Sequence, residues 1–190
     1  MVDPTKKKIR CAYEEYGVEE FYQQTGHMYK NPHGPQVEAL LRECEPLIDY
    51  SSALDLCCGA GEVTLALRTL GYELTVGCDP YTYEAYKAAT GLSCLRYTFD
   101  ELLRGQLTGD YSSIICSFAL HLCPEEKLYP LTYALFNLSP VLVIITPHKR
   151  PVLEGFKGVS LVKRTVVSTA RKKRVSLKIY TMPQHPRWQI

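Results

Sequence analysis

The chain has 190 residues, of which 46% are hydrophobic and 22% are charged, and its 12 glycines and 12 prolines form no low-complexity tract. These figures predict one globular domain and exclude a disordered chain. The longest apolar stretch, around residues 141–145, is far shorter than the roughly 18 residues that a membrane span needs. The basic N-terminus is not followed by the apolar segment of a secretory signal. We therefore expect a soluble protein of the cytoplasm or the nucleus, with no membrane partner.

Eight cysteines would suffice for a disulfide scaffold, but a chain of this size needs no such support and shows no export signal. No Cys-x-x-Cys pair is present, so the spacing of a structural zinc site is missing. His121 and Cys123 alone are too few ligands for a metal ion. We expect free thiols and no metal.

The net charge of +2 conceals an uneven distribution. From Thr146 onward, eleven Lys or Arg stand against one acid, Glu154, which gives +10, so the preceding residues carry −8. This asymmetry favours an anionic polymer or an acidic partner at one end of the fold. The alternative is a basic surface that serves only solubility.

The first fifty residues are typical of amphipathic helices, with aromatic side chains at helical spacing: Tyr13, Tyr16, Phe21, Tyr22 and Tyr29. Two prolines and a glycine within residues 31–35 then predict an ordered loop, and residues 36–44 predict a helix. We assign residues 1–50 to a helical lid that contributes to substrate recognition.

Residues 51–190 are assigned to the core. Strands are expected at 53–58, 74–79, 94–97, 111–118 and 141–146, alternating with helices at 62–70, 83–90, 99–103 and 125–138. This alternation predicts an α/β fold with a doubly wound, mostly parallel sheet. Residues 159–168 and 174–182 are β-rich and leave no room for a helix between them, so they predict an antiparallel hairpin that closes one edge of the sheet.

A glycine turn follows the first of these strands. Gly59-Ala60-Gly61 leads directly into a helix, which places backbone N–H groups where a ligand can approach closely. Asp79 ends the next strand, the position from which an acid accepts hydrogen bonds from ribose hydroxyls in nucleotide-binding folds. The pattern therefore indicates a cofactor that contains adenosine.

A dinucleotide is disfavoured at this turn. Thr64 occupies the third glycine position of the dinucleotide pattern, and Glu62 would repel a pyrophosphate. Asp55, inside the first strand, suits a ligand with a positive centre and an ammonium group. A dehydrogenase or another nucleotide binder on the same fold is the alternative.

Residues 55–62, Asp-Leu-Cys-Cys-Gly-Ala-Gly-Glu, resemble the first signature of the class I S-adenosylmethionine-dependent methyltransferases. Residues 77–80, 97–100 and 115–122 resemble the later motifs of that family in the same order, so the resemblance covers residues 53–146. It implies methyltransferase activity with S-adenosylmethionine as the cofactor.

Carried onto this chain, the resemblance implies that Gly59 and Gly61 take the methionine part with Asp55 nearby and that Asp79 takes the ribose hydroxyls. Phe99 and Asp100 would flank the adenine, and Ser117 and Phe118 would line the path between the sulfonium and the acceptor. For Phe99 and Phe118 the alternative is plain core packing. The expected cofactor-binding residues are Asp55, Cys57, Gly59, Gly61, Asp79, Pro80, Phe99, Asp100, Ser117, Phe118 and Tyr29.

A general base is needed only for an acceptor that loses a proton. The candidates are His121, His148 and His33, each of which has a structural hydrogen-bonding role as its alternative. The C-terminal charge favours an anionic methyl acceptor, most of all RNA. The residues expected to bind it are Lys149, Arg150, Lys163, Arg164, Arg171, Lys172, Lys173 and Arg174, together with Lys178. The alternatives are a small-molecule acceptor and a non-catalytic, cofactor-binding subunit of a protein partner.

Overall fold

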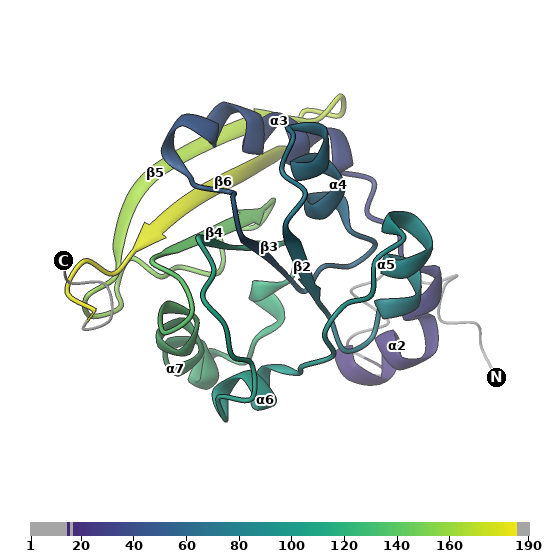
Figure 1. Ribbon diagram of the computed structural model, residues 1–190, viewed down its shortest axis with the longest axis horizontal. Coiled ribbons are helices and arrows are strands. Elements are labelled where there is room, and N and C mark those ends of the chain that lie inside the picture. Colours follow the sequence, from purple (N-terminus) through teal and green to yellow (C-terminus); the bar gives the residue numbers. More distant parts are fainter. Residues whose placement is uncertain (1–14, 16, 186–190) are drawn as a thin grey trace.

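The computed structural model describes Glu15 and residues 17–185 and contains one six-stranded sheet (Figure 1). The strand order is β2-β1-β3-β4-β6-β5, in which the first four strands are parallel and β6 is antiparallel to both of its neighbours. The doubly wound sheet and the C-terminal hairpin are thus confirmed. The strands are β1 (Ala53–Leu56), β2 (Thr75–Cys78), β3 (Ser113–Ser117), β4 (Val141–Thr146), β5 (Ser160–Ser168) and β6 (Arg174–Thr181).

Helices cover both faces of this sheet. In Figure 1, α3 and α4 lie side by side above it, whereas α6 and α7 lie below it. The helices are α2 (Val18–Thr25), α3 (Gly34–Cys44), α4 (Glu62–Thr69), α5 (Tyr83–Thr90), α6 (Phe99–Leu103) and α7 (Glu125–Phe136), with short 3₁₀ turns η2 (Gly26–Met28), η3 (Glu45–Leu47) and η4 (Leu120–Leu122). Within the described residues, no helix has both the length and the apolar composition of a membrane span.

Each face of the sheet has its own hydrophobic core. Val37, Leu40 and Leu41 of α3 are fully buried against α4 and the upper face of the sheet. Burying a side chain of this size contributes about 1.5–3 kcal/mol. α3 is therefore packed into the core, although it belongs to the segment that the sequence assigns to a lid. Tyr13 and Tyr16, which the same prediction uses, lie outside the described residues.

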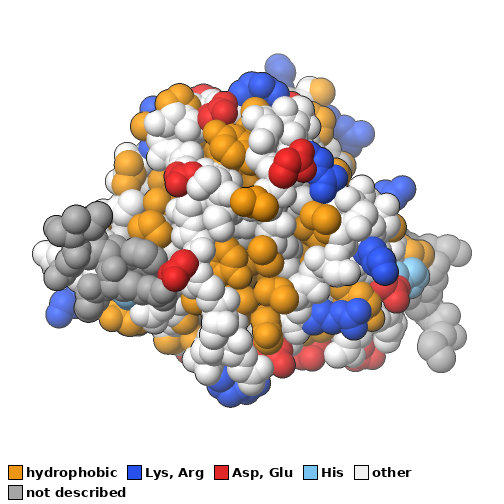
Figure 2. All heavy atoms as spheres, viewed as in Figure 1, with side chains coloured by type: hydrophobic (Ala, Val, Ile, Leu, Met, Phe, Trp, Pro, Cys, Tyr) orange, Lys and Arg blue, Asp and Glu red, His pale blue; other side chains and the backbone are white. Residues whose placement is uncertain are grey.

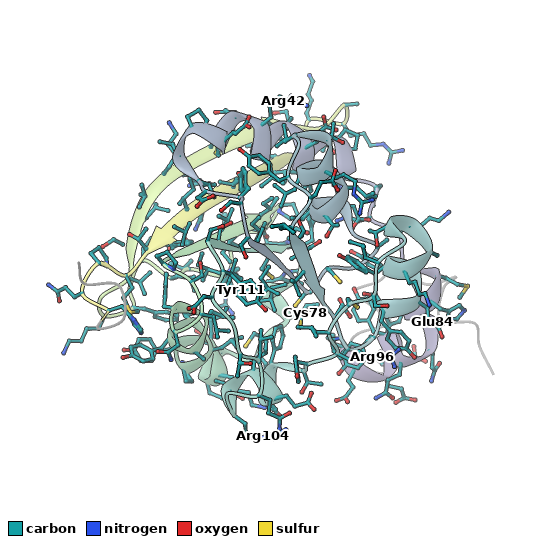
Figure 3. All side chains as sticks on the ribbon, in the orientation of Figure 1. Arg42, Cys78, Glu84, Arg96, Arg104 and Tyr111 are labelled. Carbon is teal, nitrogen blue, oxygen red and sulfur yellow. The ribbon has the colours of Figure 1, made fainter. Side chains whose placement is uncertain are left out.

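The strand predicted at residues 94–97 is wrong. Only Leu95 pairs with Cys78, in a single parallel bridge, because Arg96 turns outward over the ring of Tyr83, 3.4 Å from its centroid, and Thr98 already caps α6. Figure 3 labels Cys78 at the end of β2 and Arg96 near α5. β2 is consequently an edge strand, and hydrophobic side chains gather over it in Figure 2. Its neighbour Leu74 is 72% exposed.

The topology opens a crevice at one edge of the sheet. β1 lies between β2 and β3, so the chain connections on its two sides run in opposite directions across the sheet. In open α/β sheets, ligands bind at the carboxyl ends of the strands at such a switch point. Thr146 at the end of β4 pairs with Ser176 near the start of β6. The turn of the hairpin, residues 169–173, therefore lies at the same edge as the crevice.

Candidate functional site

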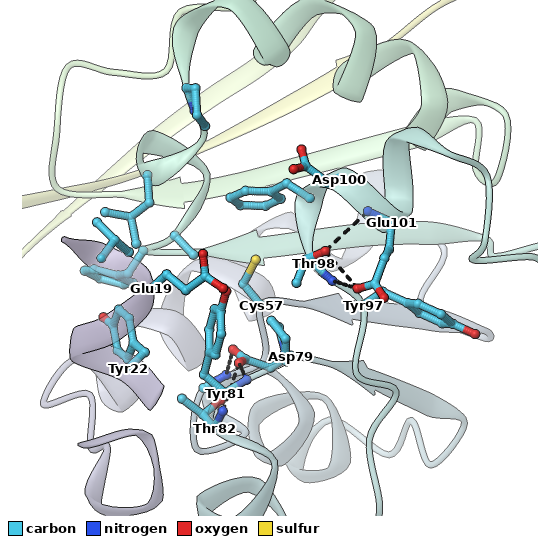
Figure 4. Close-up of a pocket in the computed structure, with 18 of the residues that line it drawn as sticks. Glu19, Tyr22, Cys57, Asp79, Tyr81, Thr82, Tyr97, Thr98, Asp100 and Glu101 are labelled. Carbon is cyan, nitrogen blue, oxygen red and sulfur yellow. Dashed lines mark hydrogen bonds between the residues drawn. The ribbon is translucent and has the colours of Figure 1, made fainter. Parts of the chain in front are cut away.

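A pocket of about 490 Å³ lies at the carboxyl ends of β1, β2 and β3 (Figure 4). Loops after these three strands form its floor, α6 forms one wall, and α2 and the segment behind it form the other. Nine of the eleven predicted cofactor-binding residues line it: Tyr29, Cys57, Gly59, Asp79, Pro80, Phe99, Asp100, Ser117 and Phe118. The structure therefore brings these nine residues together around one pocket.

The glycine turn brings backbone to the pocket where a side chain would not fit. Gly59 has a φ of +56°, and a Cβ added to it would lie 2.7 Å from Cε1 of Tyr29. Gly61 has a φ of +87°, caps α4 and faces Thr90 and Tyr86 rather than the pocket. Gly59 thus clears the ligand site, whereas Gly61 lets α4 pack closely against α5.

Asp79 joins the ends of β1 and β2. Its Oδ1 accepts hydrogen bonds from the backbone N–H groups of Tyr81 and Thr82, both at 2.9 Å, and its Oδ2 accepts one from Gly59 at 3.3 Å. The side chain lines the pocket although the residue is only 7% exposed. A carboxylate fixed in this way can accept further hydrogen bonds from ligand hydroxyls at low entropic cost.

Asp55 lies beneath the turn and, unlike the nine residues above, does not line the pocket. Its Oδ2 accepts hydrogen bonds from the N–H and the hydroxyl of Thr64, at 3.1 and 2.8 Å. Its Oδ1 has no hydrogen-bond partner within the described part of the chain. Complete burial raises the pKa of this carboxyl well above its usual range. Asp55 therefore holds the start of α4 in place. A glycine at position 64, as in the dinucleotide pattern, would lack the hydroxyl that donates to this carboxylate.

Tyrosines and one acid from α2 and the 80–82 loop close the other side, and the sequence reasoning missed most of them. The rings of Tyr22 and Tyr81 are stacked 6.4 Å apart, and the Glu19 carboxylate faces the Tyr81 hydroxyl (Figure 4). Burial and Glu19 raise the pKa of Tyr81 to about 12. The tyrosine-rich pattern was the available signal, but helical spacing alone does not tell which face covers a ligand.

α6 presents its N-terminal turn to the pocket. Thr98 and Glu101 form a reciprocal cap, in which the Thr98 hydroxyl accepts from the Glu101 N–H at 3.3 Å and Oε2 of Glu101 accepts from the Thr98 N–H at 2.8 Å. Asp100 pairs with Lys127 of α7 at 2.6 Å, and this hydrogen bond lowers the pKa of Asp100. Phe99 lies between the pocket and the lower core.

The three predicted catalytic histidines occupy two places. The rings of His121 and His148 are 4.4 Å apart, and burial together with His148 lowers the pKa of His121 to about 4. Neither ring lines the pocket. His33 stacks on the pocket residue Phe118, with centroids 5.0 Å apart and planes within 4°. Its Nδ1 lies 3.3 Å from Oε1 of Gln36, and the ring itself does not line the pocket.

The predicted acceptor-binding cations lie outside the pocket but mostly at its edge of the sheet. Lys149 and Arg150 follow β4, and residues 171–174 form the hairpin turn and the start of β6, all of them exposed. Lys163 and Arg164 lie farther along β5, exposed on the outer strand. Lys178 is a correction: it is 6% exposed and pairs with Glu154 at 2.9 Å, so it cannot contact a polyanion.

Comparison with known proteins places this geometry in context. No protein-family model matches the chain. The uncharacterized protein C17A5.05c of Schizosaccharomyces pombe is 30% identical over an alignment of 183 residues that covers 73% of this chain and 74% of that protein.

Among solved structures, the fold is similar to magnesium protoporphyrin IX methyltransferase (ChlM) from Synechocystis PCC 6803 with bound S-adenosylmethionine, with a TM-score of 0.58, 19% identity and coverage of 95% of this chain and 98% of that one. The N-methyltransferase NodS from Bradyrhizobium japonicum WM9, in complex with S-adenosylhomocysteine, gives a TM-score of 0.64 at 13% identity and covers 86% and 99%. The likeness at these identities concerns the fold, which is that of the class I methyltransferases.

Proposed function

Because the chain belongs to the family of the fission yeast protein C17A5.05c and has the class I methyltransferase fold, we propose that it is an S-adenosylmethionine-dependent methyltransferase. The observation that carries this proposal is the link between Asp79 and Gly59, which holds an acid and a bare backbone turn side by side on the pocket floor. A diol-binding acid beside a turn without side chains is what an adenosyl amino acid requires.

The residues of the pocket fit this cofactor. Tyr81, Tyr97 and Phe99 supply aromatic walls for a flat base, and Asp79 supplies an acceptor for hydroxyls. Lys127, one of the two lining cations, is already paired with Asp100, so little positive charge remains for phosphates. The lining therefore suits a nucleoside with a cationic substituent better than a dinucleotide.

When bound, S-adenosylmethionine supplies a methyl group that a sulfonium has already activated. The chain then needs to hold the acceptor in line and to exclude water, and Phe118 with the tyrosines of the covering wall can do both. For an acceptor that carries a proton, His33 is the favoured recipient, because its ring stacks on the lining residue Phe118.

We propose an anionic acceptor, and RNA in particular. The register of β4 and β6 supports this, because it sets Arg174 and the hairpin turn at the same edge of the sheet as the loop after β4 and the carboxyl ends of the parallel strands. The six cations involved are Lys149, Arg150, Arg171, Lys172, Lys173 and Arg174. Such a row can follow a phosphate backbone while one nucleotide enters the pocket.

A small-molecule acceptor is the second candidate, and the position of α2 favours it. Val18, Glu19 and Tyr22 cover one side of the pocket, which narrows the access of a polymer to the methyl group. Transfer of label from S-adenosylmethionine into a cell extract, separated into RNA, protein and small molecules, distinguishes the two acceptors.

Cofactor binding is tested by titration calorimetry with S-adenosylhomocysteine. We expect binding by the unmodified protein and a loss of about 100-fold or more for Asp79→Ala, since a buried charged hydrogen-bonding group is removed. Glu84→Ala, which removes an exposed acid of α5, is the matched control. Unchanged affinity in Asp79→Ala would remove the basis of the proposed site, and no binding at all would overturn the proposed function.

A further inference from the structure

Glu62, the first residue of α4, places a partly buried carboxylate against the glycine turn. Its Oε1 accepts a hydrogen bond from the backbone N–H of Asn31 at 3.1 Å. Its Oε2 lies 3.4 Å from the position that a Cβ on Gly59 would occupy, next to the ring of Tyr29. Gly59 and Tyr29 both line the pocket, so this oxygen lies directly behind the pocket wall at its glycine end.

The charge of Glu62 has no cationic partner within the described part of the chain. Its neighbours are the backbone N–H groups of Asn31, of Ala60 and of Glu62 itself, and no ion pair includes it. Burial raises the pKa of the carboxyl, which is the response of an acid that water and cations reach poorly. A positive group arriving at this place would gain a partner without having to displace one.

The order of groups along the pocket identifies that positive group. Phe99 of α6 and the preceding Tyr97 supply aromatic surface for a flat base on one side of the pocket, whereas Asp79 accepts a hydrogen bond from Gly59 on the pocket floor. The amino acid part of an adenosyl amino acid therefore extends toward Gly59 and Tyr29. A carboxylate attracts an ammonium there and repels a carboxylate.

We infer that Glu62 binds the α-ammonium group of the cofactor's amino acid part, a role that the sequence suggested for Asp55. Neither carboxylate lines the pocket, but Asp55 is fully buried on Thr64, whereas Glu62 is only partly buried and its Oε2 lies beside the lining residues Gly59 and Tyr29. This inference rests on the proposed cofactor. The competing explanation is that Glu62 only fixes the loop at Asn31.

The test uses Glu62→Gln, since an amide oxygen can still accept the hydrogen bond from Asn31. Titration calorimetry compares S-adenosylhomocysteine with 5′-methylthioadenosine, which shares the adenosine and the thioether but has no amino acid part. We expect the variant to bind S-adenosylhomocysteine about tenfold or more weakly and methylthioadenosine within about twofold of the unmodified protein, because only the first ligand loses a charge-assisted hydrogen bond. Glu84→Gln, an exposed first-turn acid of α5 that Figure 3 labels, should change neither affinity.

Equal weakening of both ligands would overturn the inference in favour of loop anchoring, and so would unchanged binding of S-adenosylhomocysteine. The unmodified protein provides a second test that does not depend on the folding of the variant. S-Adenosylhomocysteine with hydrogen in place of its amino group should bind about tenfold or more weakly, and equal affinity would contradict the inference. If the unmodified protein binds neither adenosyl ligand, the proposed function itself fails, which is a different result.

Discussion

The two sides of the pocket are built in different ways. On the β1–β2 side, buried hydrogen bonds fix the backbone: Asp79 holds the glycine turn and Asp55 holds the start of α4. On the β3–β4 side, the half-exposed His33 stacks on Phe118, and the exposed His148, Lys149 and Arg150 follow the end of β4. The β1–β2 side is fixed by backbone hydrogen bonds, whereas the loops of the β3–β4 side can change through surface substitutions.

The largest effect should come from the backbone of the first side. Gly61→Ala is expected to cost about 3 kcal/mol of unfolding free energy, because a Cβ there meets the side chains of Thr90 and Tyr86 in addition to the unfavourable φ. Gly71→Ala has a similar φ of +95° but open space around it, so about 1 kcal/mol is expected. Urea unfolding measures both. Equal losses would mean that the packing of α4 on α5 contributes nothing.

Substitutions of the basic residues on the β3–β4 side should weaken RNA binding without changing cofactor binding on the β1–β2 side. Replacing Arg171, Lys172, Lys173 and Arg174 with alanine is expected to weaken binding of single-stranded RNA about 100-fold at low salt and to reduce the salt slope of log K by about 3. The affinity for S-adenosylhomocysteine should stay within about twofold. A shift assay over a salt series measures the first effect. Removal of the exposed Arg42 and Lys87, away from this edge, is the control, and an equal loss there would indicate nonspecific attraction.

His121 should make the second side sensitive to acid. Its pKa is about 4 in the folded protein and 6.5 as a free side chain, so between these values the unfolded chain binds more protons. The stabilising contribution of neutral His121 is present above pH 6.5 and is lost as the pH falls toward 4. Allowing for its partial exposure, His121→Asn should remove about 1–2 kcal/mol of this dependence.

Thermal unfolding at pH 5 and pH 7 measures that dependence. His27→Asn, a change of an exposed histidine, is the control and should leave the difference between the two pH values unchanged. A variant at His121 with the full pH dependence of the unmodified protein would show that another group is responsible.

The smallest expected change in stability comes from the N-terminal cap of α6, which forms one wall of the pocket. Thr98→Ala removes the hydroxyl that accepts from the Glu101 N–H, and a loss of about 1 kcal/mol in unfolding free energy is expected. Thr98→Ser keeps a hydroxyl and should recover most of it. If alanine costs nothing, the α6 end of the pocket is held by Phe99 packing rather than by its cap.

The sequence anticipated much of the fold and of the pocket. The apolar runs at β1, β3 and β4 are short and bounded by turns, so local pattern was enough to find them. The strand expected at 94–97 failed because Arg96 and Thr98 make contacts with α5 and α6 that no local pattern encodes. Glu19 and Tyr81 were missed for the same reason, since they meet only when α2 lies over the 80–82 loop.

By itself, the sequence determined the alternating fold, the glycine turn and the acid at the end of β2, because these depend on periodicity and on backbone conformations that few residues can adopt. Only the tertiary structure decided how the acids at this turn are buried and oriented. Asp55 and Glu62 both flank the same turn, yet packing of α4 buries Asp55 on Thr64 and turns Glu62 toward Gly59. The direction of a side chain depends on the elements packed around it, and these contacts come from residues distant in the sequence.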